Sequence, residues 1–157
     1  MKTLRLFVIA ISAGLLLAGA GCKSTPDKTK LGEFDPNDSE ALKVAKTFAD
    51  DILTGVKTDN YQLFAKNLSP EMKEKMTEKT FKATVKEMTE RVGTLQVWTY
   101  LTVMDKTPLK AFVWKASFQK EIKDKDNKPV KLDTDMLFQL FIGKTDKGYV
   151  ILIFAFQ

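Results

Sequence analysis

The spacing of apolar and polar residues divides the chain into an apolar start, a polar stretch, a helical part and a β-rich part. Residues 6–20 are almost wholly apolar and uncharged, whereas residues 23–37 are mostly polar. From 39 to 56, apolar residues recur at the i, i+3, i+4, i+7 spacing of a helix with one broad buried face. This spacing predicts a helix over 39–56. Its apolar positions are Ala41, Leu42, Val44, Ala45, Phe48, Ala49, Ile52, Leu53 and Val56.

The residues between 58 and 93 predict three further helices. Thr58 or Asp59 can open the first, which is short. The second begins at 69–71, where Ser, Pro and Glu supply an N-cap, a proline at the first helical position and an early acid. The third ends at Gly93. The apolar residues expected to be buried by the first and third are Tyr61, Phe64, Leu68, Phe81, Val85, Met88 and Val92.

After Gly93 the period changes from helical to alternating, and β-forming residues become frequent. The pattern predicts four strands, over 94–104, 109–122, 130–143 and 149–156. The segments between them have the composition of turns and charged loops, and Gly148 fits the left-handed position of a short hairpin. The last strand is apolar on both faces, so we expect it to be well covered.

Alternation within the first two strands predicts which side chains share a face. In the first strand it groups Leu95, Val97, Thr99, Leu101 and Val103 against Trp98, Tyr100 and Met104. In the second strand it groups Phe112, Trp114, Ala116 and Phe118. Helices followed by an antiparallel meander predict an α+β fold, in which the N-terminal helices pack on one face of a curved four-stranded antiparallel sheet.

The N-terminus has the layout of a secretory signal. Lys2 and Arg5 form a short basic region before the apolar run. That run covers residues 6–20, which is shorter than the ~20 residues that a membrane-spanning helix needs. Residues 19–22, Gly-Ala-Gly-Cys, follow it and resemble the lipobox of bacterial lipoproteins. The resemblance implies that Cys22 carries acyl chains such as palmitate and becomes the N-terminus of the exported protein.

A second interpretation of this region stays open. Lipoboxes usually have Leu three places before the cysteine, where this chain has Gly19. Residues 18–20, Ala-Gly-Ala, also form a site for ordinary signal peptidase, which would release a soluble protein with Cys22 as a free thiol. An exposed unpaired thiol is a liability in an oxidising compartment, so we expect lipidation. By analogy with Gram-negative lipoproteins, Lys23 after the cysteine indicates the periplasmic or surface side of an outer membrane.

These observations predict three parts along the chain: a signal peptide over 1–21, a lipidated tether over 22–37 and one domain over 38–157. The tether is rich in Ser, Thr, Pro, Asp and Lys, a composition typical of disordered segments. The remaining length suffices for one domain with a single core.

Charge and composition exclude several classes of function. The net charge of +5 includes Lys2 and Arg5, so a chain that starts at Cys22 carries +3. Lysines and acids alternate through the domain, which argues against a nucleic-acid partner. The chain has no His and only one Cys, so His-dependent nucleophilic catalysis, His-ligated zinc and an internal disulfide are excluded. Its glycines form no phosphate-binding loop, and we expect no metal and no cofactor.

The domain resembles the NTF2-like superfamily, and within it the small DUF3887-type domains of bacterial lipoproteins. The resemblance covers 39–157 and is carried by three stretches. They are the helix 41–56 followed by Tyr-Gln-Leu-Phe at 61–64, the stretch 68–73 before the helix that ends at 92–93, and the four strands that end in Tyr-Val-Ile-Leu-Ile-Phe at 149–154. Residues 67–80 are too short and too polar for the hairpin usual at this position, so the domain would be a reduced version.

The resemblance implies a cone-shaped, cystatin-like cavity between helices and sheet. Some members of the superfamily are enzymes, such as ketosteroid isomerases and dehydratases, and others only bind ligands or partners, so the fold alone does not decide function. Candidate pocket-lining residues are Trp98, Tyr100, Phe112, Trp114, Phe118 and Phe138. We expect most of this aromatic set to form the core. Met72, Met76 and Met88 could floor a plastic groove, although gap filling explains them as well.

Asp133 and Asp135 are the one obvious pair of carboxylates, because their i, i+2 spacing places both on one face of a strand. They lie beside Lys131 and a charged loop, so we expect them to be solvated and ionised, and we assign no catalytic residue. The favoured hypothesis is a membrane-tethered domain that binds a partner protein or a small apolar ligand without catalysis. The alternative is an isomerase or dehydratase that uses a pocket carboxylate with Tyr100 or Tyr61.

Overall fold

The computed structural model describes residues 39–106, 109–146 and 148–157. Four helices come first: α1 (Ser39–Lys57), α2 (Tyr61–Ala65), α3 (Pro70–Lys75) and α4 (Glu78–Val92). Four strands follow: β1 (Thr94–Lys106), β2 (Leu109–Lys123), β3 (Pro129–Thr145) and β4 (Gly148–Phe156). The predicted signal peptide, Cys22 and the tether lie outside the described residues. Within the part of the chain described, no helix is both long and apolar enough to cross a membrane.

The helix boundaries follow from local signals. Ser69 caps α3 by accepting a hydrogen bond from the Met72 amide, and Pro70 is its first residue, as predicted. The opening of α2 was predicted one or two residues too early. Asn60 is its N-cap, because the Asn60 side chain accepts from the Leu63 amide. Asp59 instead takes a left-handed conformation with φ of 51°, which ends the preceding turn.

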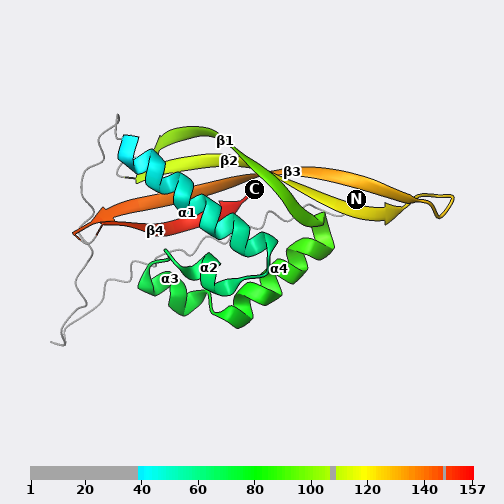
Figure 1. Cartoon of the computed structure of the whole chain (residues 1–157), viewed down its shortest axis with the longest axis horizontal. Coiled ribbons are helices and arrows are strands. Elements are labelled where there is room, and N and C mark those ends of the chain that lie inside the picture. The colour runs from blue at the N-terminus through cyan, green and yellow to red at the C-terminus, as the bar shows by residue number, and fades with distance from the viewer. Residues whose placement is uncertain (1–38, 107–108, 147) are drawn as a thin grey trace, which may run out of the picture.

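The four strands form one antiparallel sheet in the order β1-β2-β3-β4, which confirms the predicted α+β class. Figure 1 shows α1 and α4 on the same side of the sheet, with α2 and α3 beside them. β1 begins opposite Gln119 and β4 ends opposite Phe138, so β2 and β3 continue beyond both as a two-stranded arm. The arm projects from the body of the domain.

Two irregularities in β1 overturn the predicted grouping of its side chains. The register with β2 shifts between Leu95 and Val97, and again between Tyr100 and Thr102. An extra residue in a strand reverses the face on which the next side chains point. Leu95 therefore shares the helix-facing side with Trp98 and Tyr100, which pair with Ala116 and Trp114 of β2. Val97 instead faces away and is 55% exposed.

The core lies between the helices and the sheet. It buries the predicted apolar face of β2 and most of that of the first helix, although Leu42, Val44 and Phe48 are half-buried. The first helix contributes Ala41, Ala45, Ala49, Ile52, Leu53 and Val56. The sheet contributes Leu95, Phe112, Trp114, Ala116, Phe118, Phe138, Leu140, Ile142, Ile151 and Phe154. Burial of this apolar surface is the main source of stability available to a domain with no disulfide.

β4 is an edge strand, and its coverage is less complete than predicted. Ile151, Phe154 and Ala155 are buried, whereas most of the other apolar side chains of β4 are half-buried. The segment between α2 and α3 covers one point of the edge. The Ser69 amide donates to the Ile151 carbonyl at 3.2 Å, and the Ile151 amide donates to the Asn67 carbonyl at 3.2 Å. This bridge protects the edge from pairing with another chain at that point.

Candidate binding pocket

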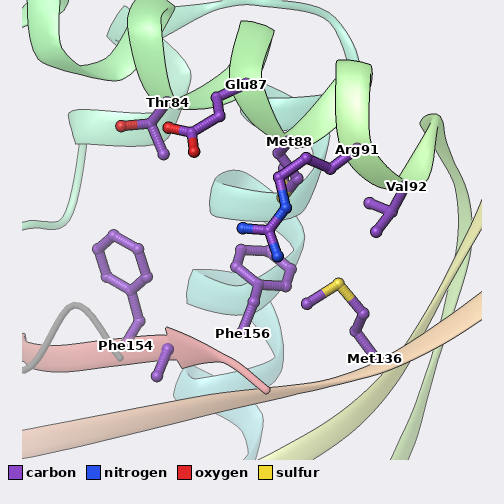
Figure 2. A pocket seen from close by; sticks show the side chains of 9 residues that line it. Thr84, Glu87, Met88, Arg91, Val92, Met136, Phe154 and Phe156 are labelled. Carbon is purple, nitrogen blue, oxygen red and sulfur yellow. The ribbon is translucent and has the colours of Figure 1, made fainter. Parts of the chain in front are cut away.

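An apolar pocket lies between α4, the middle of β3 and the C-terminal end of β4 (Figure 2). α4 contributes Thr84, Glu87, Met88, Arg91 and Val92, and the sheet contributes Met136, Phe154, Ala155 and Phe156. The cavity volume is about 70 Å³, which is several times the space that one water needs. It can therefore receive one ring or the end of an aliphatic chain.

Helical spacing determines which side chains of α4 form the upper wall of the pocket. Met88 and Val92 are four residues apart on α4, so both point toward the sheet, and both are half-buried. The register of the sheet determines which side chains form the floor of the pocket. Phe138 pairs with Phe156 on β4, and Met136 is two residues from Phe138, so Met136 and Phe156 share the helix-facing side. Met88 and Met136 both line the pocket, and their flexible thioether side chains adapt easily to ligands of different shape.

Polar groups gather at the rim of this pocket. Glu87 and Arg91 are one turn apart on α4, and both are exposed. Figure 2 shows the Arg91 guanidinium reaching down over the apolar floor toward Phe156 and Met136. The Glu87 carboxylate and the Thr84 hydroxyl lie on the other side of the opening, above Phe154. The pocket thus combines an apolar interior with one cation, one anion and one hydroxyl at its mouth.

A second hollow lies between the end of α1, α4 and the start of β1. Its volume is about 320 Å³, and its walls mix apolar side chains with many charged ones. Apolar Val56, Val85, Met88, Leu95 and Phe118 alternate with charged Lys57, Asp59, Lys82, Lys86 and Glu90. A ligand there would contact a solvated, charged wall, so this hollow is a weaker candidate for an apolar ligand than the pocket under α4.

The aromatic residues predicted from the sequence lie mainly inside the core. Phe112, Trp114, Phe118 and Phe138 are at most 2% exposed, and Phe118 also borders the second hollow. Trp98 is half-buried, and its indole N–H donates to Asp50 at 2.7 Å. Tyr100 packs edge-on against Trp114 beneath the ammonium of Lys46. Met72 and Met76 are buried in the core, whereas Met88 borders both hollows.

Sequence reasoning missed most of the pocket residues. Phe154 and Phe156 were placed only within the last strand, which was expected to be well covered, and neither Met136 nor Arg91 was predicted to form part of a site. The spacing of 84, 87, 88 and 91 places those residues on neighbouring positions of α4, but nothing local indicates which part of the sheet they face.

The predicted carboxylate pair lies on the face of the sheet opposite the helices. Asp133 pairs with Gln119 and Asp135 with Ser117, and both aspartates are exposed, as expected. The Gln119 amide donates to Asp133 at 3.0 Å. The Ser117 hydroxyl and then the Lys115 ammonium lower the pKa of Asp135 below its usual value. These contacts stabilise the ionised form of Asp135, which is the predicted state.

The two tyrosines considered for catalysis are held elsewhere. The Tyr61 hydroxyl donates to the Met76 carbonyl at 2.9 Å, so its proton is directed at backbone. Partial burial raises the pKa of Tyr100 above its usual value, because the ionised phenol loses hydration. Across the described ranges, no group of three or more His, Cys, Asp or Glu residues is placed to hold a metal ion.

A scan against protein-family models gives no match for this chain, and a search of the curated proteins gives none either.

Proposed function

We propose that this protein is an exported lipoprotein, held on a bacterial membrane by acyl chains on Cys22, whose α+β domain binds an apolar group without catalysis. That group belongs to a small ligand or to a partner protein. The observation that carries the proposal is the pocket between α4, the middle of β3 and the C-terminal end of β4, which has an apolar floor and a polar rim. The polar segment over 22–37 would link the lipid to the domain.

The pocket suits binding because apolar groups already line it before any ligand arrives. Phe156, Met136, Met88 and Val92 are half-buried and keep apolar surface in contact with water. Transfer of a ligand's apolar group onto this surface releases that water, at about 25 cal/mol for each Å² buried. Ligand sites are commonly apolar hollows with a few polar groups that fix orientation, and this pocket has that composition.

We further propose that the domain is a reduced NTF2-like fold. The arrangement supports this assignment because helices precede a four-stranded antiparallel meander and cover one of its faces. The segment between α2 and α4 is occupied by α3, a helix of six residues, where larger members of the superfamily have a hairpin.

An acid–base enzyme has less support. Such an enzyme needs a proton-transferring side chain within reach of the bound substrate. Asp133 and Asp135 are on the opposite face of the sheet from the pocket. The described residues that line the pocket include one carboxylate, Glu87, but no tyrosine.

Lipidation should be visible in the mass of the exported protein. Protein extracted from the membrane fraction should begin at Cys22 and carry the mass of its acyl chains. Several chains give stable attachment, because each buried CH₂ contributes about 0.8 kcal/mol and one chain alone binds only marginally. Cys22→Ser should abolish the added mass, because it removes the thiol that accepts lipid. An unmodified wild-type chain that begins at Gly21 would show ordinary secretion instead.

Filling the pocket should prevent it from binding apolar groups. Val92→Phe adds a ring to the half-buried upper wall. We expect photolabelling by a neutral octyl diazirine to fall by about tenfold at the peptides that carry Met88 and Met136, equal to about 1.4 kcal/mol of binding. The labelled peptides are quantified by mass spectrometry after digestion.

Leu101→Phe is the matched control for this experiment. It adds the same group at a position that is 49% exposed on β1 and does not line the pocket. Labelling at Met88 and Met136 should stay at the wild-type level in this control. Wild-type labelling in a folded Val92→Phe protein would contradict the assignment of this pocket as the binding site.

A further inference from the structure

Arg91 stands where it can bind a charged group of a ligand whose apolar part fills the pocket. It is the last basic residue of α4, one turn after Glu87 and one residue before Val92. Its guanidinium reaches over the apolar floor, toward Phe156 and Met136 (Figure 2). A guanidinium is weakly hydrated for a cation and lies readily against aromatic rings, so this position is favourable for it. The same group can form two parallel hydrogen bonds to a carboxylate.

The other rim groups restrict the charge of the ligand. Glu87 is one turn from Arg91 and borders the same pocket, so a ligand group with two negative charges would be repelled by its carboxylate. A group with one negative charge can contact Arg91 and point away from Glu87. The Thr84 hydroxyl also lies at this opening and adds a neutral hydrogen-bonding group.

The size of the cavity restricts the apolar part. About 70 Å³ accommodates the end of a short chain or a single ring. The floor is formed by flexible Met136 and by the faces of Phe154 and Phe156, which pack well against a linear chain.

We propose that the ligand is a small amphiphile with one carboxylate and an aliphatic tail, and that Arg91 binds the carboxylate while the tail enters the pocket between α4 and β3–β4. This inference rests on the proposed binding function and names the chemical class of its ligand. Arg91 then determines specificity for the acid, and the apolar floor determines affinity for the tail.

The methyl groups of the methionines allow ligand binding to be detected at the pocket itself. The full chain, labelled with ¹³C in its methionine methyl groups and held in lipid nanodiscs, is titrated with octanoate and separately with octan-1-ol. Met88 and Met136 line the pocket, whereas Met72 and Met76 are buried elsewhere in the core. Both ligands should shift the Met88 and Met136 methyl signals in a saturable way, and octanoate should bind about tenfold more tightly than octan-1-ol.

Variants of charged residues on α4 test whether Arg91 causes the preference for octanoate over octan-1-ol. Arg91→Gln should remove the preference for octanoate and leave the affinity for octan-1-ol unchanged, because only the charge-assisted contact is lost. Glu87→Gln should strengthen octanoate binding severalfold by removing a repelling charge. Lys79→Gln is the matched control, since it removes one positive charge from an exposed position of α4 outside the pocket.

The outcomes separate the two proposals. If octanoate and octan-1-ol bind equally to the wild-type chain, or if Arg91→Gln keeps the preference, the carboxylate assignment is wrong and the apolar binding function stands. If Lys79→Gln removes the preference as fully as Arg91→Gln does, the effect is one of overall charge and the site assignment is wrong. If neither ligand shifts Met88 and Met136, both the ligand class and the proposed binding function are wrong.

Discussion

Replacing Phe138 with alanine should lower the free energy of unfolding by about 3–5 kcal/mol, the range measured for large aromatic residues in close-packed cores. Phe138 is fully buried on the central strand β3. Its ring lies 5.9 Å from Trp114, 6.3 Å from Phe154 and 5.0 Å from Phe156, measured between centroids. Removing it leaves a cavity among rings that cannot easily collapse. A loss of this size is comparable with the whole stability of many domains, which is about 5–15 kcal/mol.

Leu137 offers a matched control on the same strand. It is the neighbour of Phe138, points to the opposite face and is 41% exposed. Leu137→Ala should cost about 1 kcal/mol or less, because much less apolar surface returns to water. The two variants are compared by denaturant unfolding at the same lipid content. Equal losses would show that the face covered by the helices contributes no more to stability than the outer face.

Replacing Gly93 with alanine should cost about 3 kcal/mol or more, because the substitution combines backbone strain with a close contact. Gly93 ends α4 with φ of 95°, a conformation that side chains rarely tolerate. A Cβ at this position would lie 2.2 Å from the Gln119 carbonyl oxygen and 2.6 Å from the Lys120 amide nitrogen. These are backbone atoms of β2, so neither can move aside as a side chain would.

A substitution at Gly148 separates the cost of backbone strain from the cost of the close contact. Gly148 also has a positive φ, of 113°, but no atom lies within 4 Å of a Cβ placed there. Gly148→Ala should therefore cost only the strain, about 1–2 kcal/mol. The difference between the two variants, measured from urea denaturation midpoints, gives the contribution of the close packing between the end of α4 and β2. A difference near zero would mean that this packing is loose enough to admit a methyl group.

Local sequence signals determined the elements and their order. The i, i+3, i+4 spacing from Ala41 to Val56 requires no partner to be recognised, because it reports the geometry of a single helix. The same holds for the Ser69-Pro70 start and for the stop at Gly93. Alternation likewise located the strands to within a few residues, and it identified the buried face of β2 through Phe112, Trp114 and Phe118.

The two errors have different causes: local signals competed at the start of α2, and pairing with a neighbouring strand decided the faces of β1. Thr58, Asp59 and Asn60 are all good capping residues, and only the positive φ of Asp59 leaves Asn60 as the cap of α2. In β1, strict alternation grouped Leu95 with Val97, but Gln96 is an extra residue between them, because their partners Phe118 and Ser117 are adjacent on β2. A bulge depends on the pairing with a neighbouring strand, so the alternation of one strand cannot reveal it.

Only the tertiary structure decided the pocket. Its wall comes from α4 and its floor from β3 and β4. Along the chain, the whole of β1 and β2 separates α4 from these two strands. Met136 and Phe156 become neighbours through strand register, and Arg91 reaches them through the packing of α4 on the sheet. Such contacts depend on long-range packing, which local periodicity does not encode. The sequence by itself therefore determined the α+β class and predicted a lipoprotein-like N-terminus, while the position and chemistry of the pocket follow from how the elements pack.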